Sequence, residues 1–258
     1  MPELPEVEAA RKELAKVAEG KTIARLRLLH PSLAKRITAG RLRGLKGHRI
    51  EKVERRGKHQ LVHLDDGRTI AIHFRMNGDW DIGKVSDEEP RFTRAQLELA
   101  DGTRVSLTDM RALSTVELFD KGEGEPELGP EPTDPAFNAD SLGVSLKRRS
   151  GAIKPALLDQ KMVAGIGNIY AAEALWVAKI SPKAKAASLS AHRRDKLVAA
   201  IREVLSDAPA GRYWAKHDGS RWNVYDREGE KCPRCGATIK RIVQAGRSTY
   251  YCPVDQKS

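Results

Sequence analysis

The amino terminus, Met1-Pro-Glu-Leu-Pro-Glu-Val-Glu, places one potential nucleophile beside carboxylic acids. Removal of Met1 would leave Pro2 as a secondary amine, and an α-amino group titrates near ~7.7–8.0, far below lysine. A useful fraction of such an amine is unprotonated at neutral pH and can attack a carbonyl carbon to form an imine. Glu3 could then transfer protons. The plainer interpretation is a charged helix start, with Glu3 and Glu6 at the positive end of the helix dipole.

The C-terminal tail contains all three cysteines of the chain. Cys232-Pro-Arg-Cys235 and Cys252-Pro-Val-Asp255 are two ligand pairs with the same internal spacing, which is typical of a zinc ribbon with four tetrahedral ligands. Asp255 stands where a fourth cysteine would be, and a carboxylate is a harder ligand than a thiolate, so we expect weaker retention of the metal. We predict one structural zinc ion. The alternative is a metal-free tail in which Cys252 is an ordinary thiol or pairs with a neighbour.

The charge of the chain favours a polyanionic partner. Its 258 residues include 46 Lys and Arg against 35 Asp and Glu, a formal net charge of +11. Nucleic acid is the commonest such partner, although many soluble proteins are simply basic. The hydrophobic content of 40% argues against a wholly disordered chain. No run approaches the ~18 apolar residues of a membrane span, and residues 1–15 lack a signal-peptide core. We therefore expect a soluble, cytoplasmic protein without membrane contact.

The elements that would position these groups are a helix followed by antiparallel strands. Apolar residues recur at spacings of three and four over residues 4–19, which predicts an amphipathic helix. Asp-Gly pairs at 66–67 and 101–102 predict two tight hairpins within residues 21–118, in a sandwich or a barrel. The predicted hairpin arms are His59–Leu64, Arg68–Phe74, Gln96–Ala100 and Arg104–Leu107.

The second half of the chain has a different composition. Residues 122–135 are acidic and rich in Gly and Pro, which indicates a linker. We therefore predict a domain over 1–121, a helical domain over 136–221 and a separate cysteine-containing tail over 222–258. One helix, capped by Ser188 or Ser190, is expected to end near Leu205.

Several blocks, in order along the chain, resemble a known family. The terminus resembles the formamidopyrimidine-DNA glycosylases, base-excision repair enzymes related to endonuclease VIII, and Leu4 favours the first branch. The other matching blocks are Arg56-Gly57-Lys58, His73–Gly78, Leu128–Pro132, Asp159–Ala171, Val224–Gly229 and Gly246–Thr249. The resemblance implies an α+β fold: an N-terminal antiparallel β-sandwich flanked by helices, then a helix–two-turn–helix domain ending in a zinc ribbon.

The resemblance also implies an activity. Pro2 would attack C1′ of a damaged nucleoside, and the resulting imine would lead to loss of the 3′ and then the 5′ phosphate. Glu3 would be the acid/base that helps to open the sugar, Glu6 a supporting carboxylate, and Lys58 a contact near the lesion. The implied partner of the expected monomer is double-stranded DNA with a damaged base or an abasic site. Three alternatives stay open: a non-catalytic damaged-DNA-binding module, an enzyme that prefers oxidised pyrimidines, and a zinc-ribbon RNA-binding factor.

The remaining implied residues contact DNA. The implied phosphate contacts are His73, Lys154, Asn168 and Arg247. Base extrusion leaves a hole in the duplex, and the residues implied to fill it are Met76, Arg111 and Leu113. Met76 and Leu113 could instead be core residues.

Three departures from the family pattern affect the expected substrate. Leu113 replaces an aromatic wedge, Met110 stands where proline is usual, and the stretch between Ala210 and Val224, which normally includes a loop over the oxidised purine, is short. We therefore expect cleavage at abasic sites and formamidopyrimidines, with weak action on 8-oxoguanine.

Overall fold

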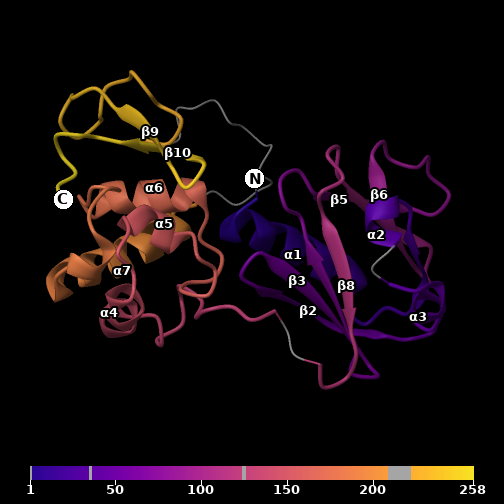
Figure 1. Ribbon diagram of the computed structural model, residues 1–258. Helices are drawn as coiled ribbons and strands as arrows, with labels where there is room; N and C mark the ends of the chain where they lie inside the picture. Colours follow the sequence, from indigo (N-terminus) through magenta and orange to yellow (C-terminus); the bar gives the residue numbers. More distant parts are fainter. Residues whose placement is uncertain (1, 35–36, 124–125, 209–221) are drawn as a thin grey trace. The chain divides into compact units, whose positions relative to one another are not determined.

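The computed structural model describes residues 2–34, 37–123, 126–208 and 222–258. The chain forms two compact units, and the division between them falls at Pro126 and Glu127, inside the predicted linker over 122–135 (Figure 1). In the described part of the chain, no helix has the length and apolar composition that a membrane crossing requires.

The first unit begins with helix α1 (Leu4–Ala18), as the apolar spacing predicts. Val7, Ala10 and Leu14 are buried along one face of this helix. Glu3 and Glu6 form a capping box at its start, in which each carboxylate accepts a hydrogen bond from the backbone N–H of the other residue. The helix start is therefore fixed by the same acidic residues that the sequence singles out for chemistry.

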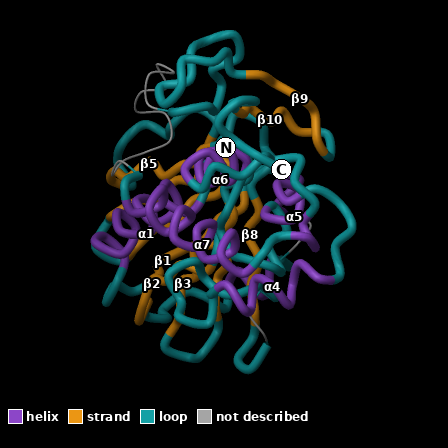
Figure 2. The backbone as a smooth tube through the Cα atoms, turned by 90° about the vertical axis from the view of Figure 1, so that its left-hand side faces the viewer, coloured by secondary structure: helices purple, strands orange, loops and turns teal. Residues whose placement is uncertain are grey.

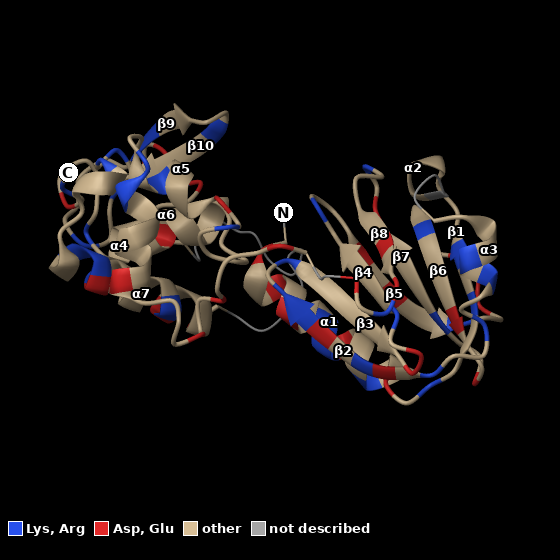
Figure 3. Ribbon diagram, turned by 60° about the horizontal axis from the view of Figure 1, so that its bottom comes forward, with Lys and Arg blue, Asp and Glu red and all other residues tan. Residues whose placement is uncertain are grey.

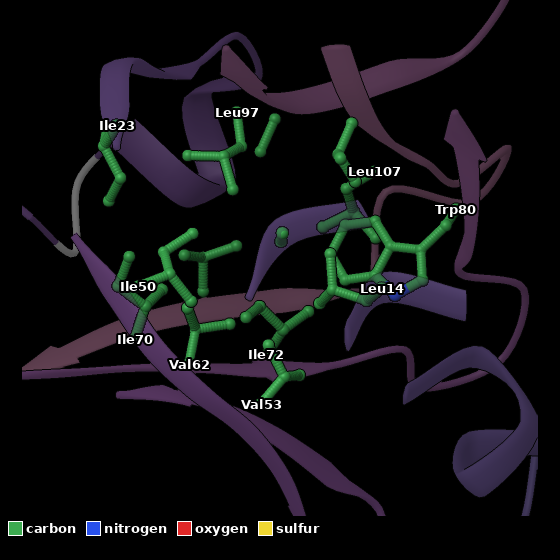
Figure 4. Close-up of a cluster of buried hydrophobic side chains, with 14 of the residues drawn as sticks. Leu14, Ile23, Ile50, Val53, Val62, Ile70, Ile72, Trp80, Leu97 and Leu107 are labelled. Atoms are coloured by element: carbon green, nitrogen blue, oxygen red, sulfur yellow. The ribbon is translucent and has the colours of Figure 1, made fainter. Parts of the chain in front are cut away.

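Two four-stranded antiparallel sheets form the rest of the first unit. One sheet has the order β1 (Ile23–Leu28), β6 (Thr93–Leu99), β7 (Thr103–Thr108), β5 (Asp79–Lys84), and the other has the order β2 (Ile50–Arg56), β3 (His59–Leu64), β4 (Thr69–His73), β8 (Thr115–Phe119). Short helices α2 (Pro31–Ala34) and α3 (Ala39–Arg43) follow β1. Side chains from α1 and both sheets share one apolar core, so the predicted sandwich is confirmed (Figure 4).

Both Asp-Gly pairs lie in hairpin turns, as predicted. Gly67 between β3 and β4 has φ +88°, and Gly102 between β6 and β7 has φ +84°, a backbone region that favours glycine. Asp66 Oδ1 accepts a hydrogen bond from the backbone N–H of Arg68 at 3.0 Å and closes the first turn. These turns set the register of the central strand pairs in each sheet.

The second unit is helical up to its C-terminal tail. Its helices are α4 (Ala139–Lys147), α5 (Ile153–Leu157), α6 (Asn168–Val177), the 3-10 turn η1 (Ala186–Ser188) and α7 (Ala191–Ser206). Ser190 caps α7, because its Oγ accepts the backbone N–H of Arg193 at 3.4 Å. The predicted end near Leu205 is thus confirmed to within one residue.

The tail carries one hairpin, β9 (Lys240–Gln244) paired with β10 (Arg247–Tyr251), and is otherwise loops and turns (Figure 2). Its buried residues Cys232, Ile239 and Cys252 form a small core with Ala172 and Trp176 of α6. The cysteine-containing segment is therefore packed on α6, the helix that follows the glycine-rich turn of Gly165 and Gly167.

Candidate functional site

The amino-terminal acids are buried together. Pro2 is buried, and Glu3 and Glu6 are only 1% and 7% exposed. The backbone N–H of Glu3 donates to Glu6 Oε2 at 3.0 Å. Met1 lies outside the described residues. A secondary amine at Pro2 would therefore have two carboxylates fixed in adjacent positions by the helix start, the arrangement that proton transfer to and from a bound sugar requires.

Lys58 lies in the two-residue turn between β2 and β3, after Gly57 with φ +58°. Arg55 ties this turn to α1: its Nε donates to Glu8 Oε2 at 3.2 Å, and its Nη1 donates to the Gly57 carbonyl at 2.9 Å. Figure 3 shows basic and acidic residues along both α1 and β2, the two elements that the Arg55–Glu8 ion pair joins. Lys58 is 8% exposed, so it is not a solvated hairpin lysine.

His73 ends β4 opposite His59, with the two rings 4.7 Å apart in an edge-on arrangement. Its Nδ1 accepts the backbone N–H of Arg75 at 2.9 Å, so the proton of the neutral ring is on Nε2. Burial, together with the nearby charges of His59, Arg75 and Lys58, lowers the pKa of His73 to about 3. This histidine can donate a hydrogen bond to a phosphate at neutral pH, but it brings no charge.

The buried carboxylate of Asp109 organises the loop over residues 109–114. Asp109 is 1% exposed, and its oxygens accept the backbone N–H groups of Arg111 (3.0 Å), Leu113 (2.7 Å) and Ser114 (2.8 Å) and the Ser114 hydroxyl (2.8 Å). Ala112 has φ +52°, an uncommon conformation that these bonds hold in place. The loop is thus a fixed platform rather than a free surface segment.

This loop and its neighbour present apolar side chains to solvent. Leu113 is 43% exposed and Met76 is 37% exposed, so the alternative that both are core residues is wrong. Arg111 is also exposed. The Ser114 hydroxyl oxygen also lies 3.1 Å from the Phe74 carbonyl oxygen, which places the loop against the turn that carries Met76. The three residues implied to fill the duplex therefore come from two connected turns.

In the second unit, the structure brings two of the implied phosphate contacts, Lys154 and Asn168, together, but the three implied residues differ in exposure. Lys154 is 1% exposed, and its Nζ donates to Asn168 Oδ1 (2.5 Å), Thr249 Oγ1 (2.7 Å) and the Ser248 carbonyl (3.1 Å). Asn168 is half-buried at the start of α6, and Arg247 is exposed at the start of β10. Lys154 therefore joins α5, α6 and β10 from inside the unit, and its ammonium is not presented at the surface.

Two polar residues, one half-buried and one buried, were missed at the sequence level. Gln160 closes the glycine-rich turn, since its Oε1 accepts the Gly165 N–H at 3.0 Å and its Nε2 donates to the Ile166 carbonyl at 2.8 Å. Glu173 is 2% exposed, and its carboxylate accepts the backbone N–H groups of Asn223, Val224 and Tyr225, each at 2.9 Å. The sequence feature that could have indicated Glu173 is that it is the one charged residue in the largely apolar helix NIYAAEALWV.

The sulfur atoms of Cys232, Cys235 and Cys252 all lie within 4.8 Å of one another, a spacing that suits a common metal ion. Burial raises the pKa of Cys232, but hydrogen bonds, first of all from the Trp176 indole, lower it to about 7. Thiolates are the soft donors that zinc prefers. The residues present therefore fit a zinc ion with three sulfur ligands.

Asp255 does not lie in this sulfur cluster. Its carboxylate accepts a hydrogen bond from Arg234, whose guanidinium stacks 3.7 Å from the centre of the Trp176 ring. The backbone N–H of Asp255 points to Cys252 Sγ at 3.4 Å. The backbone is thus placed as in a metal-binding turn, while the side chain is directed to Arg234. The predicted loop between Ala210 and Val224 lies for the most part outside the described residues.

Comparison with known proteins gives the same family across the chain. The family of the formamidopyrimidine-DNA glycosylase N-terminal domain matches residues 1–116, its H2TH domain matches 128–213, and the zinc finger found in FPG and IleRS matches 229–257. Formamidopyrimidine-DNA glycosylase of Novosphingobium aromaticivorans is 40% identical over 273 residues and covers all of both chains. That of Chloroflexus aurantiacus is 40% identical over 279 residues, with 99% of this chain and 98% of the relative covered.

Solved structures agree with this match. The Lactococcus lactis formamidopyrimidine-DNA glycosylase bound to DNA with an abasic site superimposes with a TM-score of 0.91 at 32% identity, over the full length of both chains. A mutant of the same protein, in complex with DNA containing Fapy-dG, gives 0.92 at 32% identity over both full chains. A MutM complex with DNA containing carbocyclic 8-oxo-G gives 0.91 at 32% identity, again over both full chains.

Proposed function

The chain belongs to the formamidopyrimidine-DNA glycosylase family, whose members are enzymes with DNA glycosylase and abasic-site lyase activity, and from this premise we propose which of its residues carry the reaction. Pro2, after removal of Met1, is the nucleophile. Its nitrogen forms a bond to C1′ as the bond from C1′ to the damaged base breaks. The proposal depends above all on one observation: Glu3 and Glu6 are buried and fixed to each other directly beside Pro2.

In this scheme Glu3 protonates the ring oxygen O4′ while the bond between C1′ and O4′ breaks, which leaves an iminium ion between Pro2 and the opened sugar. The proton that Pro2 loses on bonding to C1′ leaves with the displaced base. Proton removal from the opened sugar then expels the 3′ phosphate, and a second elimination expels the 5′ phosphate. Glu6 supports this exchange, because it accepts the Glu3 backbone N–H and holds that residue in place. Lys58, fixed through its turn to α1, contacts the DNA near the lesion.

Borohydride reduction in the presence of abasic-site DNA tests the nucleophile. The mature chain should give a covalent complex, and a variant with one extra residue ahead of Pro2 should give none because its terminal amine is displaced. Pro5→Ala is the matched control and should still give the covalent complex. Pro5 lies in the first turn of α1 and its nitrogen is part of a peptide bond, so it is not a free amine. A protein that binds abasic DNA tightly but never traps would instead be a non-catalytic binding module.

The proposed partner is double-stranded DNA that contains an abasic site or a formamidopyrimidine, as in the Lactococcus lactis complexes. We propose that His73, Asn168 and Arg247 contact phosphates and that Met76, Arg111 and Leu113 fill the space of the extruded base. Their exposure supports this for Met76, Arg111, Leu113 and Arg247. We assign Lys154 a positioning role, because its ammonium is held by three internal acceptors. The protein would act as a monomer on DNA of the bacterial nucleoid.

The proposed lesion preference is for abasic sites and formamidopyrimidines over 8-oxoguanine. Leu113 offers less stacking surface than an aromatic side chain, and the stretch between Ala210 and Val224 is short. Single-turnover rates on the three substrates test this preference. An 8-oxoguanine rate equal to the other two would contradict it. The comparison is informative because a structurally similar protein, MutM, is in complex with DNA that contains carbocyclic 8-oxo-G.

We also propose that one structural zinc ion is held by Cys232, Cys235 and Cys252, with Asp255 as the fourth ligand. The ion would cross-link the two turns of the tail and contribute to its folding. Asp255 could supply one oxygen after a side-chain rotation while Arg234 keeps the other, because ligating carboxylates are usually hydrogen-bonded in turn. Zinc competition with a chelator tests this assignment: Asp255→Cys should retain zinc more tightly and Asp255→Ala less tightly. Equal retention in all three proteins would remove Asp255 from the ligand set.

A further inference from the structure

We propose that Phe92 is a base-stacking residue of the DNA-binding surface, and that it supplies the aromatic ring that the loop over 109–114 lacks. The ligand is the face of a base that loses its stacking partner when the damaged nucleotide is extruded. This inference rests on the proposed function and deepens it by naming a residue outside the sequence blocks that resemble the family.

Exposure of a large aromatic side chain to water is unfavourable, yet the side chain of Phe92 is exposed. It lies in the connection between β5 and β6, just before Thr93, and its side chain is 39% exposed. Among the large apolar side chains that stand exposed in the described residues, it is the one aromatic. It is not part of the apolar core of its own unit. Aromatic side chains contribute strongly to interfaces when they are covered by a partner, so an exposed ring outside the core is available for such a contact.

The backbone of Phe92 is fixed in a conformation that a residue with a Cβ rarely adopts. Its φ is +66°, in the left-handed region. The Phe92 carbonyl accepts the backbone N–H of Asp109 at 3.0 Å. Asp109 is the residue whose carboxylate organises the loop over 109–114. Phe92 and Leu113 are therefore held by the same residue, and their relative positions are set before DNA binds.

Arg94 makes a second connection between Phe92 and that loop. Its Nε donates to the Asp109 carbonyl at 2.6 Å and its Nη2 donates to the Met110 carbonyl at 3.3 Å. The same guanidinium lies 5.9 Å from the centre of the Phe92 ring, and that of Arg91 lies 4.8 Å from it. An aromatic ring flanked by arginines combines a surface for stacking with charges that attract phosphates, as in proteins that bind unpaired bases.

The loop itself explains why such a residue is needed. Residues 109–114 read Asp-Met-Arg-Ala-Leu-Ser and contain no aromatic side chain. Leu113 and Met110 can enter a duplex but provide no ring to cover an unstacked base. Phe92 is attached to this loop through Asp109, so it can provide that ring without any change in the loop.

The test uses the full-length protein and duplexes that carry an uncleavable abasic analogue with 2-aminopurine at the position opposite or next to it. Phe92→Leu should weaken binding about tenfold, since stacking of one base on an aromatic residue is of that order, and should remove the change in 2-aminopurine fluorescence. Phe92→Trp should bind at least as tightly as the parent protein and restore the fluorescence change. Val85→Ala, at an exposed apolar residue of the same connection, is the control and should have no effect.

The inference is overturned if Phe92→Leu, folded by circular dichroism, binds the analogue duplex as tightly as the parent with an unchanged signal. It is also overturned if the variant weakens binding to undamaged duplex equally, because the ring would then contact the backbone. Borohydride trapping by the parent protein separates this failure from that of the proposed function. If the parent protein traps abasic DNA while Phe92→Leu and Phe92→Trp change neither binding nor fluorescence, only the proposed role of Phe92 is wrong.

Discussion

Each unit of the molecule contains a buried charged side chain that holds neighbouring residues in place, Asp109 in the first unit and Lys154 in the second, and these two charges are opposite in sign. In the first unit the Asp109 carboxylate accepts hydrogen bonds from residues no more than five positions away. In the second unit the Lys154 ammonium donates to acceptors that are 14, 94 and 95 positions away. The hydrogen bonds of Asp109 shape a loop, whereas those of Lys154 connect elements that are remote in sequence. Beside each of these side chains lie exposed residues that we propose contact DNA.

The largest effect should come from Asp109→Asn. The amide cannot accept at both oxygen positions, so at least one buried N–H loses its partner and the charge-assisted bonds weaken. We expect the free energy of unfolding to fall by roughly 3 kcal/mol and discrimination between abasic and undamaged duplex to be lost. Urea unfolding and binding titrations measure both quantities. Asp81→Asn, at a half-exposed carboxylate of β5, is the control. A variant with unchanged stability and discrimination would show that the loop does not depend on this carboxylate.

A second expected effect concerns acid stability of the first unit. Burial holds the pKa of His73 at about 3 in the folded chain, against about 6.5 when it is exposed on unfolding. The unfolded chain therefore binds more protons between these values, and stability that is complete above about pH 6.5 decreases as the pH falls toward 3. His73→Gln should reduce this loss of unfolding free energy at low pH by roughly 2 kcal/mol. The value allows for the partial exposure of His73.

Thermal unfolding at a series of pH values measures the effect. His192→Gln, at an exposed position of α7, should keep the parent's pH dependence. Binding titrations of His73→Gln at several salt concentrations test the DNA contact, because replacement of a neutral His73 should leave the salt dependence of binding unchanged. A smaller salt slope in His73→Gln would mean that the ring is charged in the complex.

Lys154→Met should have a smaller effect on stability than Asp109→Asn. Methionine fills much of the same volume, and removal of a buried charge together with its desolvation cost is often nearly neutral. We expect a loss of roughly 1 kcal/mol from the unpaired acceptors. DNA affinity should fall because Asn168 and β10 are then connected only by the bond from Asn168 Nδ2 to the Ser248 carbonyl at 3.0 Å, but the slope of log affinity against log salt should stay the same. A reduced slope would show that the ammonium neutralises a phosphate and is not only a positioning group.

The difference between the short-range hydrogen bonds of Asp109 and the long-range hydrogen bonds of Lys154 also explains which features could be predicted from the sequence. The hairpins, the α1 helix and the Ser190 cap follow from contacts within a few residues, and each was predicted from local spacing. The exposure of Met76 and Leu113 was not, because an apolar residue in a strand-rich segment points to either face with equal local plausibility.

The burial of Lys154 could not be predicted for a related reason. Its acceptors on β10 lie more than 90 positions away, and no local pattern links a lysine of a five-residue helix to them. The same holds for Glu173, whose partners begin 50 positions later. Asp255 was predicted to be a metal ligand from the spacing of the cysteines, but in the structure its side chain bonds to Arg234, whose position depends on stacking on Trp176.

The smallest expected effect separates contact from positioning most directly. Arg247 is exposed at the start of β10, next to the Ser248 carbonyl that Lys154 holds. Its replacement by alanine should leave stability unchanged and reduce the salt slope by about 0.9, the value for one phosphate neutralised on duplex DNA. Arg241→Ala on the paired strand is the matched control, because Arg241 already donates to Ser248 Oγ at 3.0 Å within the hairpin. If both variants changed the slope equally, the hairpin would act as a diffuse positive surface, and the precise placement that Lys154 gives to β10 would have no role in DNA binding.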